Sequence, residues 1–330
     1  MANIPLFFIR KLVNSSPRCA LLGINGAFCL NQENIRSFFF RACIMQRSHN
    51  NSFDCKVFSR MKKTTVFVFF NALLIFGNSL VIADEPAYGG VTELSAGIEL
   101  FRWQEFDRAG TRLLTEQGPR ARLNFSHHNE RRLTSGLLYR MDASVYGGVV
   151  DYDGQTQRLG QFSAARVDYL GAATELTGGY RLVNFKWGRS LDLLAGVGLD
   201  RWSRDIGNGT SSQGARVIGY EEVFDIAFTR FSLGMEKRAD IWRSLWRAGI
   251  KYPVYTNETI DAFSLELKPG KRPSLFLSYR FQLIGSAGDE GAYVKFLYDS
   301  YRFAKSDVVS RFEQPKSDMD VMSFSIGRAF

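Results

Sequence analysis

The chain has 330 residues and a formal net charge of +9, and 45% of its residues are hydrophobic. Residues 1–83 hold ten of the 42 Lys and Arg residues and two of the 33 acidic residues, which leaves 32 basic and 31 acidic residues beyond. That larger part is nearly neutral, which excludes nucleic-acid binding through a basic surface. All four cysteines also lie before position 84, so the rest of the chain has neither disulfides nor a cysteine-based metal site.

A leader precedes the main domain. Met61 and two lysines are followed by the largely apolar segment Thr64–Ala83, which ends in Val-Ile-Ala. A basic start, an apolar run and small residues before a cut site predict a secretory signal peptide (61–83) that is cleaved after Ala83. Met61 is then the expected start, and residues 1–60 are an upstream extension with no assigned fold. An uncleaved anchor helix and, for 1–60, a transit peptide are the alternatives.

Apolar and polar residues alternate in ten stretches beyond position 83. A period of two predicts strands with one apolar and one polar face. No stretch in this part has the ~18 consecutive apolar residues of a membrane-spanning helix, so any crossing of a membrane is by strands. The sixth stretch changes phase near residues 229–231, which predicts a β-bulge. The ten stretches are 93–101, 120–127, 133–147, 164–182, 191–202, 220–237, 245–255, 274–284, 292–303 and 318–330.

The last stretch carries a specific pattern. Phe324, Ile326 and Phe330 share one face, and small residues alternate with them. This pattern resembles the C-terminal strand of Gram-negative outer-membrane β-barrels, in which the terminal Phe is part of the signal read by the barrel-assembly machinery. Arg328 departs from it, because the pattern prefers an apolar residue there. The resemblance covers about residues 84–330 and identifies no subfamily.

This resemblance implies an all-β fold, a transmembrane antiparallel up-and-down β-barrel in the bacterial outer membrane. It also implies outer-membrane lipid, lipopolysaccharide and the barrel-assembly machinery as partners. We expect about ten strands, with eight or twelve as alternatives. Such barrels have short periplasmic turns and long extracellular loops. The expected turns are 128–132, 183–190, 238–244 and 285–291, and the expected long loops are 104–119, 149–163, 203–219, 256–273 and 304–318.

Alternation alone also fits a soluble, lipocalin-like barrel with its apolar face inward. Glycines on the polar face favour a membrane barrel, because they weaken an exposed strand but make room inside a narrow lumen. These glycines are Gly97, Gly136, Gly196, Gly198, Gly249 and Gly327. Aromatic residues near strand ends also favour it, because membrane interfaces attract them. These aromatic residues are Trp103, Trp187, Trp202, Trp242, Trp246, Tyr252 and Tyr301.

Charges of both signs share the polar face, and we interpret them as a charge network that fills the lumen. Buried charges persist when they are paired and hydrogen-bonded. The predicted interpretation is therefore a structural plug, and the alternative is a narrow, charge-lined path for ions or solutes. The predicted network comprises Glu93, Glu99, Arg120, Arg122, Arg140, Asp142, Asp192, Asp200, Arg247, Lys251, Arg280, Lys295 and Asp299.

The sequence indicates no catalytic centre, metal site or cofactor. Beyond the leader, the only histidines are His127 and His128, which we expect at a periplasmic turn as ordinary polar residues. Ser126 and His127 are adjacent and therefore point to opposite faces of a strand. We predict a small porin-like, structural or surface-binding barrel that is not an enzyme, with an unknown extracellular ligand. The alternative is a protease or lipid hydrolase with an unrecognised site at the extracellular rim.

Overall fold

The computed structural model describes residues 90–129, 135–155, 162–184, 189–284 and 291–330. The predicted signal peptide, the upstream extension and Trp187 lie outside these residues. No helix among them is long and apolar enough to span a membrane.

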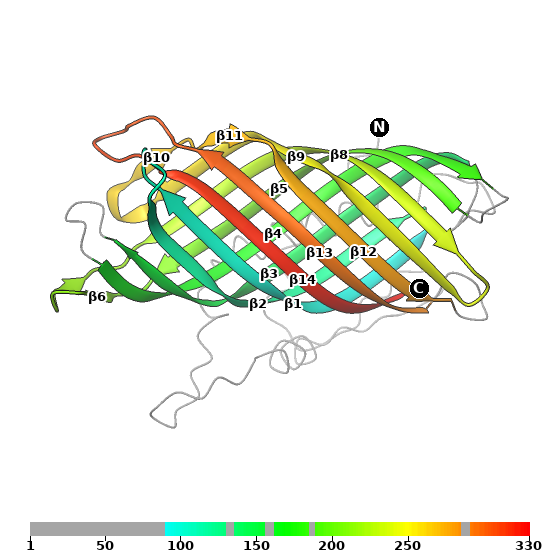
Figure 1. Ribbon diagram of the computed structural model, residues 1–330, viewed down its shortest axis with the longest axis horizontal. Coiled ribbons are helices and arrows are strands. Elements are labelled where there is room, and N and C mark those ends of the chain that lie inside the picture. Colours follow the sequence, from blue (N-terminus) through cyan, green and yellow to red (C-terminus); the bar gives the residue numbers. More distant parts are fainter. Residues whose placement is uncertain (1–89, 130–134, 156–161, 185–188, 285–290) are drawn as a thin grey trace, which may run out of the picture. The chain divides into compact units, whose positions relative to one another are not determined.

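Ten long strands form a closed antiparallel barrel (Figure 1), which confirms the predicted fold and strand number. Each strand pairs with its neighbours, and β1 pairs with β14 from Glu93↔Ala329 to Phe106↔Lys316 to close the ring. Closure leaves no unpaired edge, as a membrane-spanning sheet requires. The strands are β1 (Val91–Phe106), β2 (Arg112–His128), β3 (Gly136–Gln155), β4 (Phe162–Asn184), β5 (Arg189–Ile206), β8 (Glu221–Arg238), β9 (Trp242–Ile260), β12 (Ser274–Leu283), β13 (Gly291–Ala304) and β14 (Lys316–Ala329).

Among the described residues, the shorter elements gather at one end of the barrel. They lie at the end opposite the C-terminus (Figure 1), and they join strands that we expected to be linked by long loops. They are β6 (Gly209–Ser211), β7 (Arg216–Val217), the 3-10 helix η3 (Asp261–Phe263), β10 (Leu265–Leu267) and β11 (Gly270–Arg272). This long-hairpin end is extracellular in the topology of outer-membrane barrels.

The long strands reach further than the sequence predicts. They have 10 to 23 residues, whereas the stretches expected from the sequence run from 8 residues (120–127) to 19 (164–182). The expected loop 104–119 is mostly strand, because β1 and β2 remain paired until a turn that begins after Phe106. The ladder therefore continues well beyond the membrane and forms an extracellular extension of the barrel.

An apolar belt surrounds the barrel. In β1, Leu94, Ile98 and Leu100 point outward with 52–64% of their surface exposed, and equivalent outward positions on other strands are also apolar. Beyond the belt the outer face becomes charged, with ion pairs such as Arg102–Asp320 at 2.8 Å and Arg201–Asp225 at 3.1 Å. An exposed apolar band of this kind is the lipid-facing surface of a transmembrane barrel. The protein is thus an outer-membrane β-barrel, as predicted.

The predicted bulge lies on a different strand. β8 keeps one phase throughout, whereas the register skips Val254 of β9 between Ala227↔Tyr255 and Phe228↔Pro253. Val254 and Tyr255 consequently both face outward, with 45% and 50% of their surface exposed. The phase change inferred from the sequence of β8 is wrong, because the apolar residues change from its inner to its outer face while the backbone continues unchanged.

Several aromatic residues expected at the membrane interface lie inside the barrel instead. Trp103, Trp202 and Tyr301 are at most 2% exposed and belong to a buried lumen cluster. Trp246 and Tyr252 point outward, with 44% and 42% of their surface exposed. The first three residues are therefore packing residues of the lumen, and the prediction that placed them at the interface is wrong.

Candidate functional site

The lumen contains the polar groups with the greatest potential for function. All thirteen residues of the predicted charge network have the inward parity of their strands and are buried or half-buried. They fall into a lower tier near the short turns and a middle tier around a cavity. Above these tiers lie an aromatic layer and an upper acidic compartment that the sequence did not predict.

Glu93 is the centre of the lower tier. Its carboxylate accepts hydrogen bonds from His128 at 2.5 Å, from Arg140 at 3.4 Å and from Arg280. Arg140 also donates to Asp142 at 2.8 Å. His128 is fully buried, so it is part of the lumen network and not the ordinary turn residue that we expected.

A second group in the lower tier includes three residues that the sequence analysis missed. The Arg181 guanidinium forms a bidentate pair with Asp192 at 2.7 Å and a further ion pair with Glu236 at 2.9 Å. Arg243 lies 3.5 Å from the other carboxylate oxygen of Glu236. These four side chains are at most 1% exposed, which makes this group a desolvated network.

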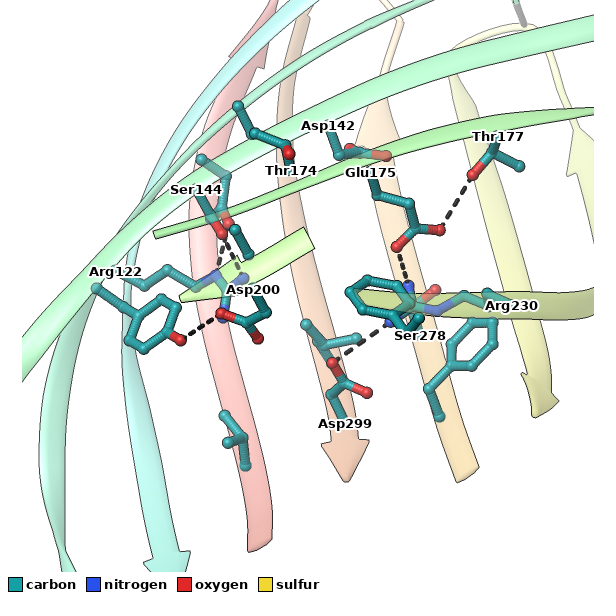
Figure 2. A pocket seen from close by; sticks show the side chains of 18 of the residues that line it. Arg122, Asp142, Ser144, Thr174, Glu175, Thr177, Asp200, Arg230, Ser278 and Asp299 are labelled. Atoms are coloured by element: carbon teal, nitrogen blue, oxygen red, sulfur yellow. Dashed lines mark hydrogen bonds and ion pairs between the residues drawn. The ribbon is translucent and has the colours of Figure 1, made fainter. Parts of the chain in front are cut away.

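The middle tier surrounds a cavity of about 120 Å³ (Figure 2). Arg230 extends into it and joins Glu175 at 2.7 Å to Asp299 at 3.4 Å. Lys251 neutralises the other oxygen of Asp299 at 2.7 Å. The volume accommodates several water molecules. Charged side chains from different strands therefore pair across it.

One wall of the cavity is fixed by Glu99. This carboxylate accepts hydrogen bonds from Arg120 at 2.8 and 3.1 Å and from Arg122 at 2.5 Å. The Arg120 guanidinium also lies 4.0 Å from the ring centroid of Phe101 and 4.7 Å from that of Tyr146. Such stacking positions a cation where hydration is weak. Glu99 and the aromatic rings together hold both arginines in fixed positions.

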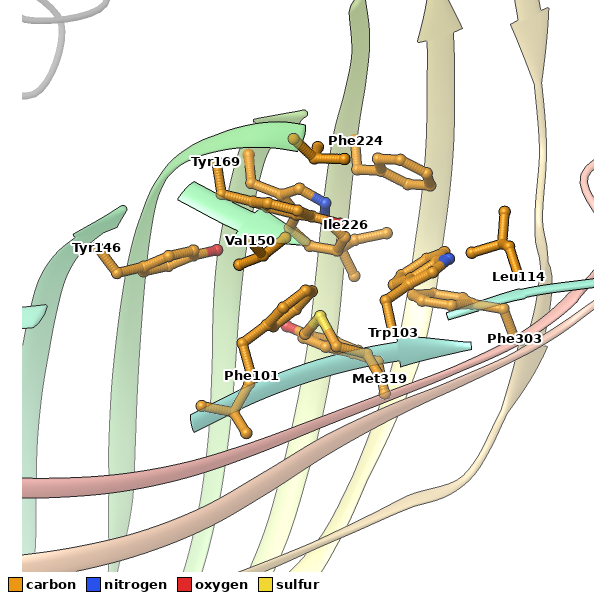
Figure 3. Close-up of a cluster of buried hydrophobic side chains, with 14 of the residues drawn as sticks. Phe101, Trp103, Leu114, Tyr146, Val150, Tyr169, Phe224, Ile226, Phe303 and Met319 are labelled. Carbon is orange, nitrogen blue, oxygen red and sulfur yellow. The ribbon is translucent and has the colours of Figure 1, made fainter. Parts of the chain in front are cut away.

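An aromatic layer crosses the lumen above the cavity (Figure 3). Trp202 stacks on Phe224 with ring centroids 5.1 Å apart, and Trp103 lies 5.4 Å from Phe224. Tyr301 stacks on Phe303 at 5.7 Å and donates to Asp200 at 3.0 Å. The layer therefore packs tightly across the barrel and remains anchored to the charged tier below it.

The acidic compartment above this layer comprises Glu105, Glu116, Arg204, Glu222 and Glu258. Arg204 donates to Glu105 at 3.1 Å, to Glu116 at 3.2 Å and to Glu222. These residues lie above the apolar belt, level with the charged outer face. Burial raises the pKa of Glu116 to about 7, although Arg204 and the Tyr169 hydroxyl oppose the shift. Burial also raises the pKa values of Glu222 and Glu258.

The sequence analysis missed the compartment because its members lie in or beside segments assigned to loops. Arg204, Glu105, Glu116 and Glu258 belong to the strand extensions, and Glu222 is the second residue of β8, the strand whose phase was misread. Phe101, Trp103 and Glu105 share one parity, and this continued period of two was the sequence signal that could have identified such strand ends. Among the described residues, no group of three or more His, Cys, Asp or Glu side chains is arranged to hold a metal ion.

The predicted assembly residues point outward on the strand that closes the barrel. Phe324, Ile326 and Phe330 have 42%, 59% and 53% of their surface exposed. Phe330 is tied to β1 through its backbone N–H, which donates to the Thr92 carbonyl at 2.8 Å. Their positions are those of lipid-facing residues at the end that holds the short turns.

Comparisons with known proteins yield structural likeness only. No family model and no curated protein matches the chain. The outer membrane protease OmpT from Escherichia coli has a TM-score of 0.48 at 12% identity, covering 76% of this chain and 98% of its own. The outer membrane protein OprG from Pseudomonas aeruginosa has a TM-score of 0.31 at 12% identity, covering 74% of this chain and 97% of its own. Ail, the attachment invasion locus protein of Yersinia pestis, has a TM-score of 0.27 at 10% identity, covering 73% of this chain and 99% of its own. The likeness does not extend to an activity, so function is argued from the lumen itself.

Proposed function

We propose that this protein is a closed outer-membrane barrel whose filled lumen is a structural plug and whose extracellular extension presents a binding surface. The observation that carries this proposal is the stacking of two different barriers. Cross-lumen ion pairs of Arg230, Glu175 and Asp299 lie below the layer that contains Trp103 and Trp202. An open pore requires a continuous water path, which side chains packed across a ten-stranded barrel do not leave.

We expect planar-bilayer recordings of the refolded wild type to stay near baseline. A double variant, Trp202→Ala with Arg230→Ala, should give measurable conductance, because it removes a large ring from the upper barrier and the central cation from the lower one. Trp246→Ala with Arg201→Ala is the matched control, since both side chains face outward. Large, stable channels in the wild type would contradict the plug and favour transport.

The alternative of an enzyme at the extracellular rim has less support. Carboxylates do gather at that end, but Glu116 and Glu258 are fully buried and no substrate reaches them in this conformation. His127 points outward and accepts from or donates to Thr92 at 3.1 Å, away from both lumen and rim. We therefore propose a non-catalytic protein.

The barrel-assembly machinery and lipopolysaccharide are the proposed partners during and after insertion. The outward Phe330 ring makes little packing contact, so replacing it should affect assembly more than folded stability. We expect Phe330→Ala to lower the amount of protein in the outer membrane while the refolded barrel keeps its thermal stability. Phe231→Ala is the control, because Phe231 is outward and 63% exposed on another strand. Equal membrane amounts for Phe330→Ala and wild type would count against an assembly signal.

A further inference from the structure

The acidic compartment contains more negative charge than its surroundings neutralise. Four carboxylates share one guanidinium, and three of them already contact Arg204. Glu258 is 0% exposed, and neither of its carboxylate oxygens has a hydrogen-bond partner among the described residues. A buried carboxylate without a partner is neutral unless a cation reaches it. The geometry therefore requires that some of these four carboxylates be protonated.

An apolar cap covers the compartment at the long-hairpin end. It comprises Tyr220, Ile260, Phe263, Leu265, Leu267 and Phe312. Phe263 lies between Tyr220 and Phe312, with ring centroids 6.3 and 4.9 Å away. β10 joins the cap to the compartment directly, because Leu267 pairs with Glu258 and Leu265 with Ile260. The ladder holds Ile260, Leu265 and Leu267, so the part of the cap that can move is the connection between β13 and β14, whose Phe312 ring packs on Phe263.

We propose that the compartment is a proton-operated latch, in which protonated acids keep the cap docked and their ionisation releases it. Ionisation of Glu258 beside Leu267 requires water or a counter-cation, and we infer that water enters when the connection carrying Phe312 moves away from the barrel. The groups that face the cluster come from every adjoining segment. They are Glu105 of β1, Glu116 of β2, Tyr152 of β3, Tyr169 of β4, Arg204 of β5, Tyr220, Glu222 of β8, Glu258 of β9 and Gln314.

The direction of the pH effect follows from the raised pKa values. An acid that binds its proton more tightly in the docked state stabilises docking fully below its ordinary pKa. That stabilisation is lost as the pH rises through the raised value, which is about 7 for Glu116. Each titrating carboxyl changes the docked-to-released ratio about tenfold per pH unit within this window. Acid therefore closes the cap, and neutral to alkaline pH opens it.

A spin label in the connection between β13 and β14 tests the latch, because the mobility of the label is measured without a chemical reaction that itself depends on pH. Val308, 58% exposed, lies in the connection that carries Phe312 and is suited to a Val308→Cys label. The full chain is used with its four native cysteines replaced by serine, namely Cys19, Cys29, Cys43 and Cys55. In the refolded barrel, we expect the mobile fraction of the electron paramagnetic resonance spectrum to rise at least tenfold between pH 5 and pH 8.

Glu258→Gln mimics the protonated acid and should move this transition upward by at least one pH unit. Glu116→Gln gives the same comparison at a second position, should the first variant fail to fold. Glu266→Gln, an exposed carboxylate on β10, should behave as wild type. A spectrum that does not change with pH, or an unshifted transition in a folded Glu258→Gln or Glu116→Gln barrel, would overturn the latch. Closure at pH 8 that depends on calcium and is abolished by a chelator would also overturn it, in favour of a metal.

Discussion

Replacing Glu93 with glutamine should destabilise the barrel more than removing any one of its cationic partners. Glu93 compensates Arg140 and Arg280 and also binds His128. Its loss leaves two buried guanidinium groups without their shared carboxylate. Breaking a buried ion pair in this way costs roughly 3–5 kcal/mol. In contrast, Arg280→Gln leaves Glu93 with Arg140 and His128, so its cost should be smaller.

Unfolding in urea, followed by the gel mobility of the folded barrel, measures both free energies. Glu266→Gln is the control for the same change at an exposed carboxylate on β10, where an effect within about 0.5 kcal/mol is expected. A Glu93→Gln barrel as stable as wild type, or less affected than Arg280→Gln, would show that Glu93 is not the centre of this tier.

The sequence predicts the lipid-facing half of this barrel well for a physical reason. Lipid is a uniform solvent, so Leu94, Ile98 and Leu100 need only be apolar and follow the period of two. The lumen has no such uniformity. In β8 the inward residues change from Phe224 and Phe228 in the aromatic layer to Glu236 in the charged tier. In the sequence, this change of apolar face looks like a β-bulge.

Ion-pair partners were also beyond sequence analysis, because the barrel joins residues that lie far apart in the chain. Arg204 and Glu116 are 88 positions apart, and Arg280 and Glu93 are 187 apart. Parity places all of them inside the barrel, but which charges meet depends on strand tilt and register. The alternation of polar residues therefore predicted which charges face inward, whereas their arrangement in tiers needed the three-dimensional structure.

Arg204→Met should produce the largest pH-dependent loss of stability in the protein. Arg204 is the only cation in contact with Glu105, Glu116 and Glu222 among the described residues, and methionine retains much of its length without the charge. At pH 8 the ionised carboxylates lose their counter-cation whether or not the cap has opened, and we expect a loss of about 3–5 kcal/mol. At pH 5 the acids with raised pKa values are already protonated, so the loss should be smaller.

Urea unfolding at the two pH values checks this expectation. Each additional proton bound by the folded barrel changes the free energy of unfolding by about 1.4 kcal/mol per pH unit. Arg201→Met is the matched control. Arg201 is 61% exposed on the outer face and pairs with Asp225, and an exposed pair of this kind contributes at most about 1 kcal/mol. Equal losses at pH 5 and pH 8 for Arg204→Met would mean that the carboxylates remain ionised at both values. The acidic compartment would then have to be hydrated at pH 5 as well as at pH 8, because only water can stabilise four charges at that spacing without their cation.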